Sequence, residues 1–178
     1  MTTVGSSTTR KGAAICVALF VCPPLAAAAW PTVNVWLDLI PAASAKMRQD
    51  TLTIMSVNGT ATHSFAIEVA ATEKEKALGL MFRTDLSDGQ GMLFPYAAER
   101  NLQMWMHNTY IPLDMLFIRA DGTIARIEER AEPLSDRVIS SGSPVLAVLE
   151  IPGGAAGRLG IKAGDKVRYP IFSAANSR

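Results

Sequence analysis

The residues whose types could support binding or catalysis gather at one turn, between two apolar runs of residues 101–117. A Trp ring beside amide, imidazole and carboxylate groups offers an apolar plate with a few directional polar contacts, which suits a glycan or a peptide-like ligand. We therefore expect a ligand-binding corner at this turn. Its candidate residues are Arg83, Trp105, His107, Asn108, Thr109, Asp114 and Glu150.

Asp114 is the most constrained member of this set, because it stands between the core-type residues Leu113 and Met115. A buried carboxylate without a partner is costly, so we expect Asp114 to be paired with Arg83 or Arg100. Such a pair would be purely structural in one interpretation and part of a polar site in the other. Asn and Thr at a turn also often bond only the local backbone, which is the simpler interpretation of Asn108 and Thr109.

Catalytic and metal-binding signatures are weak. Asp114 and Glu150 could form the acid pair of a hydrolase, but sequence spacing does not fix their separation, and we lean against an enzyme. A set of methionines could in principle bind Cu(I), but core packing is the simpler role, and we expect no metal and no cofactor. These methionines are Met81, Met92, Met104, Met106 and Met115.

Residues 1–45 have the layout of a secretory leader. Arg10 and Lys11 precede an apolar stretch over residues 12–22, which is shorter than the ~20 residues that span a bilayer. Small residues place cleavage near residues 28–29 or, as we favour, after Ala45. An uncleaved N-terminal anchor is the alternative. We expect an exported protein, periplasmic or extracellular, with no stable membrane anchor after cleavage.

The expected mature chain, residues 46–178, is one domain. Both cysteines lie in the leader, so this domain has no disulfide or thiolate chemistry. Removing Arg10, Lys11 and Asp38 from totals of 17 basic and 16 acidic residues leaves 15 of each. This zero net charge gives no indication of a nucleic-acid partner. The expected partner is a cell-envelope ligand or protein.

The pattern of the mature chain is mostly that of short strands. Residues 51–57 and 63–70 alternate around an Asn58-Gly59 turn, which predicts a hairpin. Thr72 and Glu75 form a capping box that predicts a short helix. The fold class is therefore mostly β, a single β-sandwich or barrel-like domain with one or two short helices. The other expected elements are strands over 92–94, 102–107, 113–119, 123–129, 144–151 and 166–172, a loop over 131–143, and a helical turn within 153–160.

Five sequence blocks in order make the chain resemble the bacterial and archaeal domain-of-unknown-function family 192. The blocks are GLMFR (79–83), GMLF (91–94), MWMHNTYIPLDMLFI (104–118), VLEIPGG (148–154) and LGIKAGDKV (159–167). The resemblance implies a small, often exported β domain with a sandwich-like fold and no established activity. His107 stands where the family usually has Lys, which weakens any role that needs a permanent cation there.

Three classes of function follow from these features. The first is a cell-envelope binding module with its ligand at the corner of Trp105, Asn108 and Asp114, which we favour. The second is a carboxylate-dependent hydrolase that uses Asp114 or Glu150. The third is a structural or accessory envelope domain without a small-molecule site, which an exposed apolar patch would favour.

Overall fold

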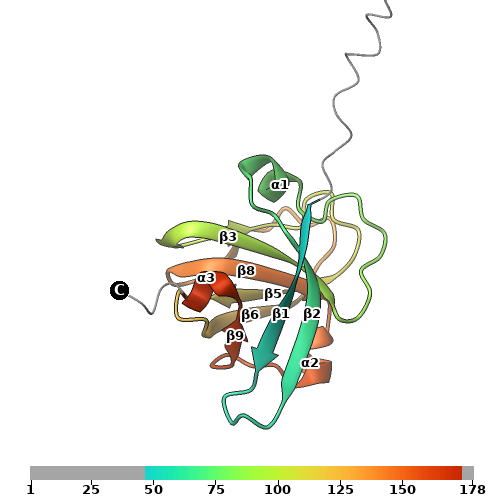
Figure 1. The fold of residues 1–178 in the computed structure, drawn as a ribbon. Helices are drawn as coiled ribbons and strands as arrows, with labels where there is room; N and C mark the ends of the chain where they lie inside the picture. The colour runs from blue at the N-terminus through green and yellow to red at the C-terminus, as the bar shows by residue number, and fades with distance from the viewer. Residues whose placement is uncertain (1–46, 174–178) are drawn as a thin grey trace, which may run out of the picture. The chain divides into compact units, whose positions relative to one another are not determined.

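The computed structural model describes residues 47–173 (Figure 1). The expected leader and its cleavage site lie outside these residues. The described part is mostly β, as predicted, with a seven-stranded sheet, a two-stranded sheet and three short helices. The elements are β1 (Arg48–Met55), β2 (Thr62–Val69), α1 (Glu73–Leu78), β3 (Gln90–Arg100), β4 (Gln103–Met104), β5 (Leu113–Ile118), β6 (Ile124–Ala131), β7 (Ile139–Ser140), β8 (Val145–Pro152), α2 (Ala155–Leu159), β9 (Lys166–Arg168) and α3 (Pro170–Ser173).

The large sheet curls until its two edge strands meet at one end. Its strand order is β6-β5-β8-β3-β2-β1-β9. The segment before β6 reaches β9 through an antiparallel bridge between Thr123 and Lys166. Ile124 N also donates to Asp165 O at 2.9 Å. The sheet therefore forms an incomplete barrel with an inner and an outer face.

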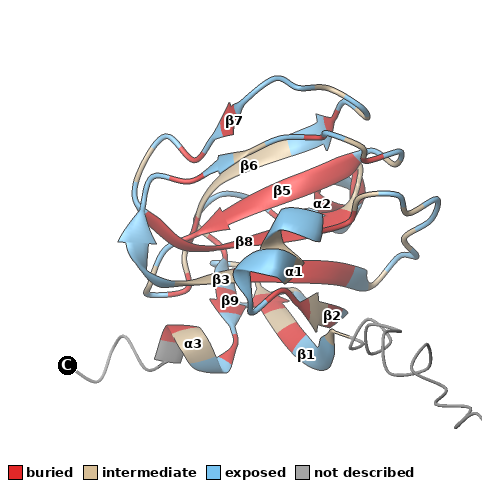
Figure 2. Cartoon of the chain, turned by 90° about the horizontal axis from the view of Figure 1, so that it is seen from above, coloured by how far each residue is buried: buried red, intermediate tan, exposed pale blue. Residues whose placement is uncertain are grey.

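Each face of this sheet carries its own hydrophobic cluster. The inner cluster includes Leu52, Phe65 and Leu149, together with Ala155 and Ala156 of α2. The outer cluster is covered by loops and by the small β4-β7 sheet. Its buried members are Ala70, Leu80, Met92, Phe94, Leu102, Met106, Leu113, Met115, Phe117, Ala131, Ile139, Val145 and Val148. Both faces of the sheet are covered at its centre, so β5 and nearly all of β8 are buried (Figure 2).

Helix α1 connects two parallel strands, β2 and β3, which a short turn could not join. The predicted capping box starts it: Glu75 N donates to Thr72 Oγ1 at 3.2 Å, and Thr72 N donates to Glu75 Oε2 at 2.8 Å. Gly79 ends the helix with a φ of 48°. The helix lies beside β3 (Figures 1 and 2), and Lys76 Nζ lies 4.5 Å from the centre of the Tyr96 ring.

Four expectations about the elements were wrong. Pro95 does not end β3, because beyond Leu93 the strand pairs with β8 but no longer with β2, and an edge position tolerates a residue without an N–H. The strand expected over 102–107 is only β4, and β7 lies in a segment expected to be loop. The last strand ends at Arg168, because Pro170 begins α3. No helix in the described part is long and apolar enough to cross a membrane.

Candidate functional site

The predicted corner is built from three loops that are tied together by backbone hydrogen bonds. The loop after α1 joins through Phe82 N, which donates to Asn108 O at 2.9 Å. The loop after β6 joins through Leu134 N, which donates to Thr109 O at 3.0 Å. Met106 N donates to Ser135 O at 3.0 Å and closes the same junction. The loops therefore form one unit on the outer face of the sheet.

Three residues of this unit have left-handed backbone conformations without being glycine. The φ angles are 64° at Phe82, 52° at Asn108 and 60° at Leu134. Asn tolerates this region, whereas a bulky residue there costs roughly 1 kcal/mol or more. Such strain is typical of recognition loops that the surrounding structure holds in place.

Large apolar side chains are exposed on the same three loops. Trp105 and Phe82 are each 57% exposed, Leu134 is 59% exposed and Tyr110 is 48% exposed. The Phe82 and Tyr110 rings meet edge to face, with centroids 6.3 Å apart. The buried side chain of Met106 anchors the central loop in the outer cluster. The loops thus present aromatic groups to solvent from a fixed base.

Trp105 and His107 follow β4 outside any strand, and their ring centroids are 5.9 Å apart. His107 Nδ1 donates to Asp136 Oδ1 at 2.7 Å, because an ionised carboxylate can only accept. Within the described residues, the second ring nitrogen and the second carboxylate oxygen make no hydrogen bond. Asp136 was not anticipated, because no local pattern links residue 136 to the 105–109 turn. We call Trp105, His107 and Asp136 the indole platform.

The other predicted site residues do not converge on this platform. Arg83 makes a two-armed ion pair with Glu68, at 2.7 and 2.6 Å. Thr109 is buried, and its Oγ1 donates to His107 O at 3.2 Å, which is the local turn role. Asn108 contributes its left-handed backbone and its carbonyl.

The expected pairing of Asp114 with Arg83 or Arg100 was wrong. Asp114 is fully buried, and three backbone N–H groups satisfy it. Arg130 N and Gly154 N donate to Oδ1 at 2.7 and 2.8 Å, and Ala156 N donates to Oδ2 at 2.8 Å. The carboxylate therefore joins β5 to the end of β6 and to the start of α2. Its role is structural.

Two glycines make room for this junction. A Cβ on Gly153 would lie 2.8–2.9 Å from atoms of Pro112, and one on Gly154 would lie 2.8 Å from Arg130 Nε. Gly154 also has a φ of 80°. Gly154 thus brings its N–H group to Asp114, whereas Gly153 N donates to Pro112 O at 2.9 Å.

Glu150 lies on the opposite, outer face of β8, between Met92 of β3 and Met115 of β5. It is 4% exposed, and burial raises the pKa of its carboxyl group to about 8. No charged group or hydrogen-bond donor of the described residues offsets this burial. Because no fully enclosed side-chain oxygen lacks a hydrogen bond in the described part, the Glu150 oxygens keep a narrow contact with water.

These positions argue against an acid pair of Asp114 and Glu150. The two residues face opposite sides of the sheet, because Met115, which pairs with Glu150, follows Asp114 directly in β5. The described residues also contain no group of three or more His, Cys, Asp or Glu side chains placed to hold a metal ion. Met92, Met106 and Met115 are fully buried in the outer cluster, and Met104 packs against it, which is the core-packing role.

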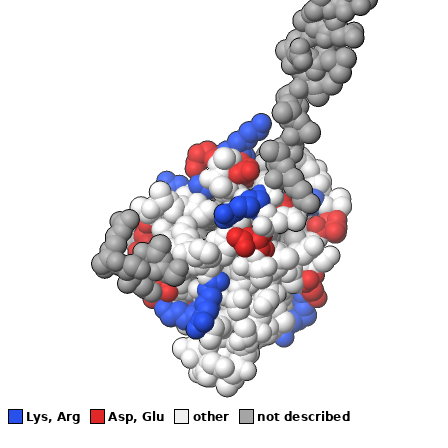
Figure 3. Space-filling view, in the orientation of Figure 1, with Lys and Arg blue, Asp and Glu red and all other residues white. Residues whose placement is uncertain are grey.

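The surface charges are mixed. On the face shown in Figure 3, basic and acidic side chains alternate without a large patch of either sign. Glu128 forms ion pairs with both Arg126 and Arg137. This face offers no basic stripe of the kind that tracks a nucleic-acid backbone.

The curled seven-stranded sheet and its covered outer face place the described part of the chain among small, mostly β domains. The chain belongs to the family domain of unknown function 192 (DUF192), described as Uncharacterized ACR, which it matches over residues 53–169. The resemblance seen in the five sequence blocks is thereby confirmed. No curated protein matches the chain.

Two solved structures are similar to this chain. A proposed transcription regulator from Sinorhizobium meliloti 1021 is 39% identical, covers 71% of this chain and 97% of its own, and has a TM-score of 0.69. A protein of unknown function from Novosphingobium aromaticivorans DSM 12444 is 41% identical, covers 71% of this chain and 89% of its own, and has a TM-score of 0.67. These comparisons identify the family of the chain, and the family is described as uncharacterised.

Proposed function

We propose that this protein is an exported binding module that holds a glycan of the cell envelope on the indole platform. The observation that carries the proposal is the exposed Trp105 ring beside the hydrogen-bonded side chains of His107 and Asp136. More than half of the Trp105 side chain is exposed to solvent on this fixed loop. A ligand with one apolar face and several hydroxyl groups covers this surface and bonds the polar groups beside it.

A pyranose ring meets this description. Its C–H face packs on an aromatic plate, and its hydroxyl groups bond to polar side chains at the rim of the plate. His107 Nε2 and the free oxygen of Asp136 are such rim groups. An anionic ligand is less suited, because the Asp136 carboxylate of the platform would repel it.

The tied loops give this surface the rigidity that binding needs. Ordering mobile loops and side chains on binding costs affinity, and a preorganised surface avoids that cost. Here the backbone bonds of Phe82, Leu134 and Met106 and the buried side chain of Met106 fix the loops before any ligand arrives. The strain at Phe82 and Leu134 is consistent with a surface kept for recognition rather than for stability.

Export is part of the proposal and rests on the sequence of residues 1–45. Strand β1 begins at Arg48, shortly after Ala45, so cleavage after Ala45 leaves every described element whole. The described domain also holds no cysteine, so it needs no oxidant to fold in the envelope.

Cleavage gives a direct prediction. Protein recovered from the envelope fraction should begin at Lys46, or near Trp30 if the earlier site is used. N-terminal sequencing or intact-mass measurement distinguishes these forms. Recovery of the chain with Met1 from the cytoplasm would contradict export.

The platform gives a second prediction. Trp105→Ala should weaken binding of soluble envelope glycan fragments at least tenfold, about 1.4 kcal/mol, because it removes the stacking plate. Calorimetric titration measures the affinity, and thermal unfolding should stay within ~0.5 kcal/mol because the side chain is exposed. The matched control is Val57→Ala, an exposed apolar side chain in the β1-β2 turn, which should bind like the parent. Equal affinities of all three proteins would exclude the platform.

A protein-docking accessory domain is the second candidate. The exposed side chains of Phe82, Tyr110 and Leu134 favour it, because clustered apolar groups in water often mark a protein contact. This function predicts that Leu134→Asp abolishes capture of an envelope protein while glycan binding is unchanged.

A further inference from the structure

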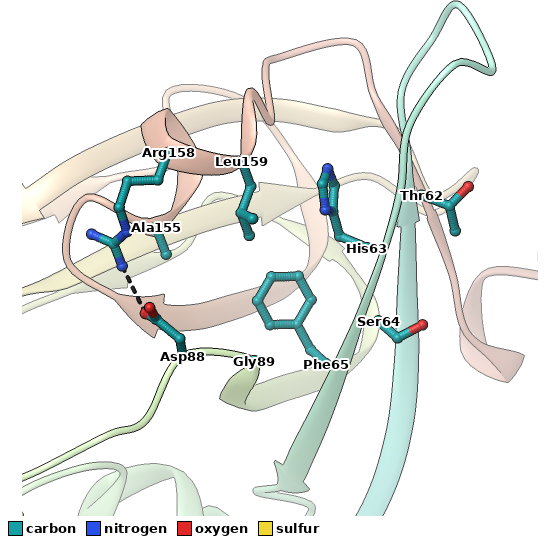
Figure 4. A pocket seen from close by; sticks show the side chains of 9 residues that line it. All are labelled: Thr62, His63, Ser64, Phe65, Asp88, Gly89, Ala155, Arg158 and Leu159. Atoms are coloured by element: carbon teal, nitrogen blue, oxygen red, sulfur yellow. Dashed lines mark hydrogen bonds and ion pairs between the residues drawn. The ribbon is translucent and has the colours of Figure 1, made fainter.

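A cavity of about 270 Å³ opens between β2, the loop before β3 and helix α2 (Figure 4). Its lining combines an apolar interior with charged groups at the edge. The residues are Thr62, His63, Ser64, Phe65, Asp88, Gly89, Ala155, Arg158 and Leu159. The volume fits a small molecule rather than a polymer, and barrel mouths are common ligand sites.

His63 occupies a position that a core residue would ordinarily fill. Along β2, Phe65, Ile67 and Val69 alternate toward the inner cluster, and His63 continues this series at the end of the barrel. Its imidazole makes no hydrogen bond within the described residues. Figure 4 shows the ring of His63 and the side chains of Phe65 and Leu159 around a shared space. The barrel end is therefore left open beside an imidazole with free bonding capacity.

The rim of the cavity carries one charge of each sign. Arg158 Nη2 donates to Asp88 Oδ1 at 2.7 Å, and both side chains stay largely exposed. A purely anionic ligand would be repelled by Asp88, and a purely cationic one by Arg158. A zwitterion can bond the remaining donors of Arg158 and the second oxygen of Asp88 without breaking their pair.

We propose that this cavity binds a free α-amino acid with an apolar side chain. The ligand carboxylate bonds Arg158 and its ammonium group bonds Asp88, while His63 lies across the cavity from this pair (Figure 4). Its side chain packs against Phe65 and Leu159. This site shares no residue with the indole platform, so either proposal can fail without the other.

The two histidines of the chain allow a direct test. His63 lies in the cavity and His107 lies on the indole platform, so their imidazole resonances report the two sites separately. The full-length protein is titrated with L-leucine, with 3-methylbutylamine, which lacks the carboxylate, and with 4-methylpentanoate, which lacks the amine. His63→Gln assigns the resonances. Leucine should shift the His63 signal at millimolar concentration and leave His107 unchanged.

Each truncated analogue should bind about tenfold or more weakly, because it leaves one charged rim group without its partner. Arg158→Gln and Asp88→Asn should weaken leucine binding to a similar extent, with unchanged thermal melting as the check that both variants fold. Absence of a His63 shift with leucine would overturn the proposal. Equal binding of leucine and either analogue would overturn the zwitterion assignment.

Discussion

Replacing Asp114 by Ala is expected to destabilise the domain by roughly 3–5 kcal/mol, the range for a buried group whose partners are left unpaired. The substitution removes the acceptor of Arg130 N, Gly154 N and Ala156 N, and two of these three bonds are fully buried. Stability in water, obtained from urea unfolding, is the measurement. A loss of this size is a large part of the 5–15 kcal/mol that typically holds a domain together.

Asp114→Asn makes the prediction sharper. The amide oxygen can still accept from Arg130 N and Gly154 N, but the amide NH₂ then faces Ala156 N, and one donor is left without an acceptor. We expect a loss of about 1–3 kcal/mol, between the parent and Asp114→Ala. Asp85→Ala, at an exposed position, is the control and should change little. If Asp114→Ala were as stable as this control, the carboxylate would not be the structural junction described above.

The second large effect concerns pH. The pKa of Glu150 is raised from 4.5 to about 8 in the folded chain, so the folded state holds this proton more tightly than the unfolded state. Stability from this group is fully present below pH 4.5 and is lost as the pH rises to about 8. Between these two pH values the free energy of unfolding falls by about 1.4 kcal/mol per pH unit, and the total loss is of order 3–5 kcal/mol.

Glu150→Gln isolates this effect, because the amide cannot titrate. Urea unfolding of the parent and the variant is compared from pH 5 to pH 9. Other titrating groups contribute equally to both proteins, so the difference between the two curves reports Glu150 alone. The free energy of unfolding of the variant, relative to that of the parent, should rise steadily with pH up to about 8. Parallel curves would show that the carboxyl group ionises as freely in the folded state as in water.

Local pattern was enough to predict most of the fold. The hairpin of β1 and β2, the Thr72 capping box and the apolar run of β8 each reflect bonds or burial within a few residues of sequence. The outer cluster explains the error at residues 102–107. Residues 102–107 follow an apolar pattern because Leu102 and Met106 anchor a loop in this cluster, and only two residues of the segment pair as a strand.

Local sequence pattern also predicted part of the candidate site. Burial of Asp114 and its need for partners followed from Leu113 and Met115. The partners themselves are backbone N–H groups of distant turns, and no side-chain type in the sequence marks them. Trp105 and His107 do lie together, but in a loop and not in the strand from which their proximity was predicted, and Asp136 reaches His107 only through the packing of the loops.

The most direct measurement of the central proposal is the fluorescence of Trp105. The other two tryptophans, Trp30 and Trp36, lie in the expected leader, so in a chain that begins at residue 46 the emission comes from Trp105 alone. Titration with soluble envelope glycan fragments should shift this emission to shorter wavelength in a saturable manner, because a stacked sugar removes water from the indole. The shift should be weakened by His107→Ala. Emission that stays at the wavelength of an exposed indole at saturating glycan would contradict the proposed function.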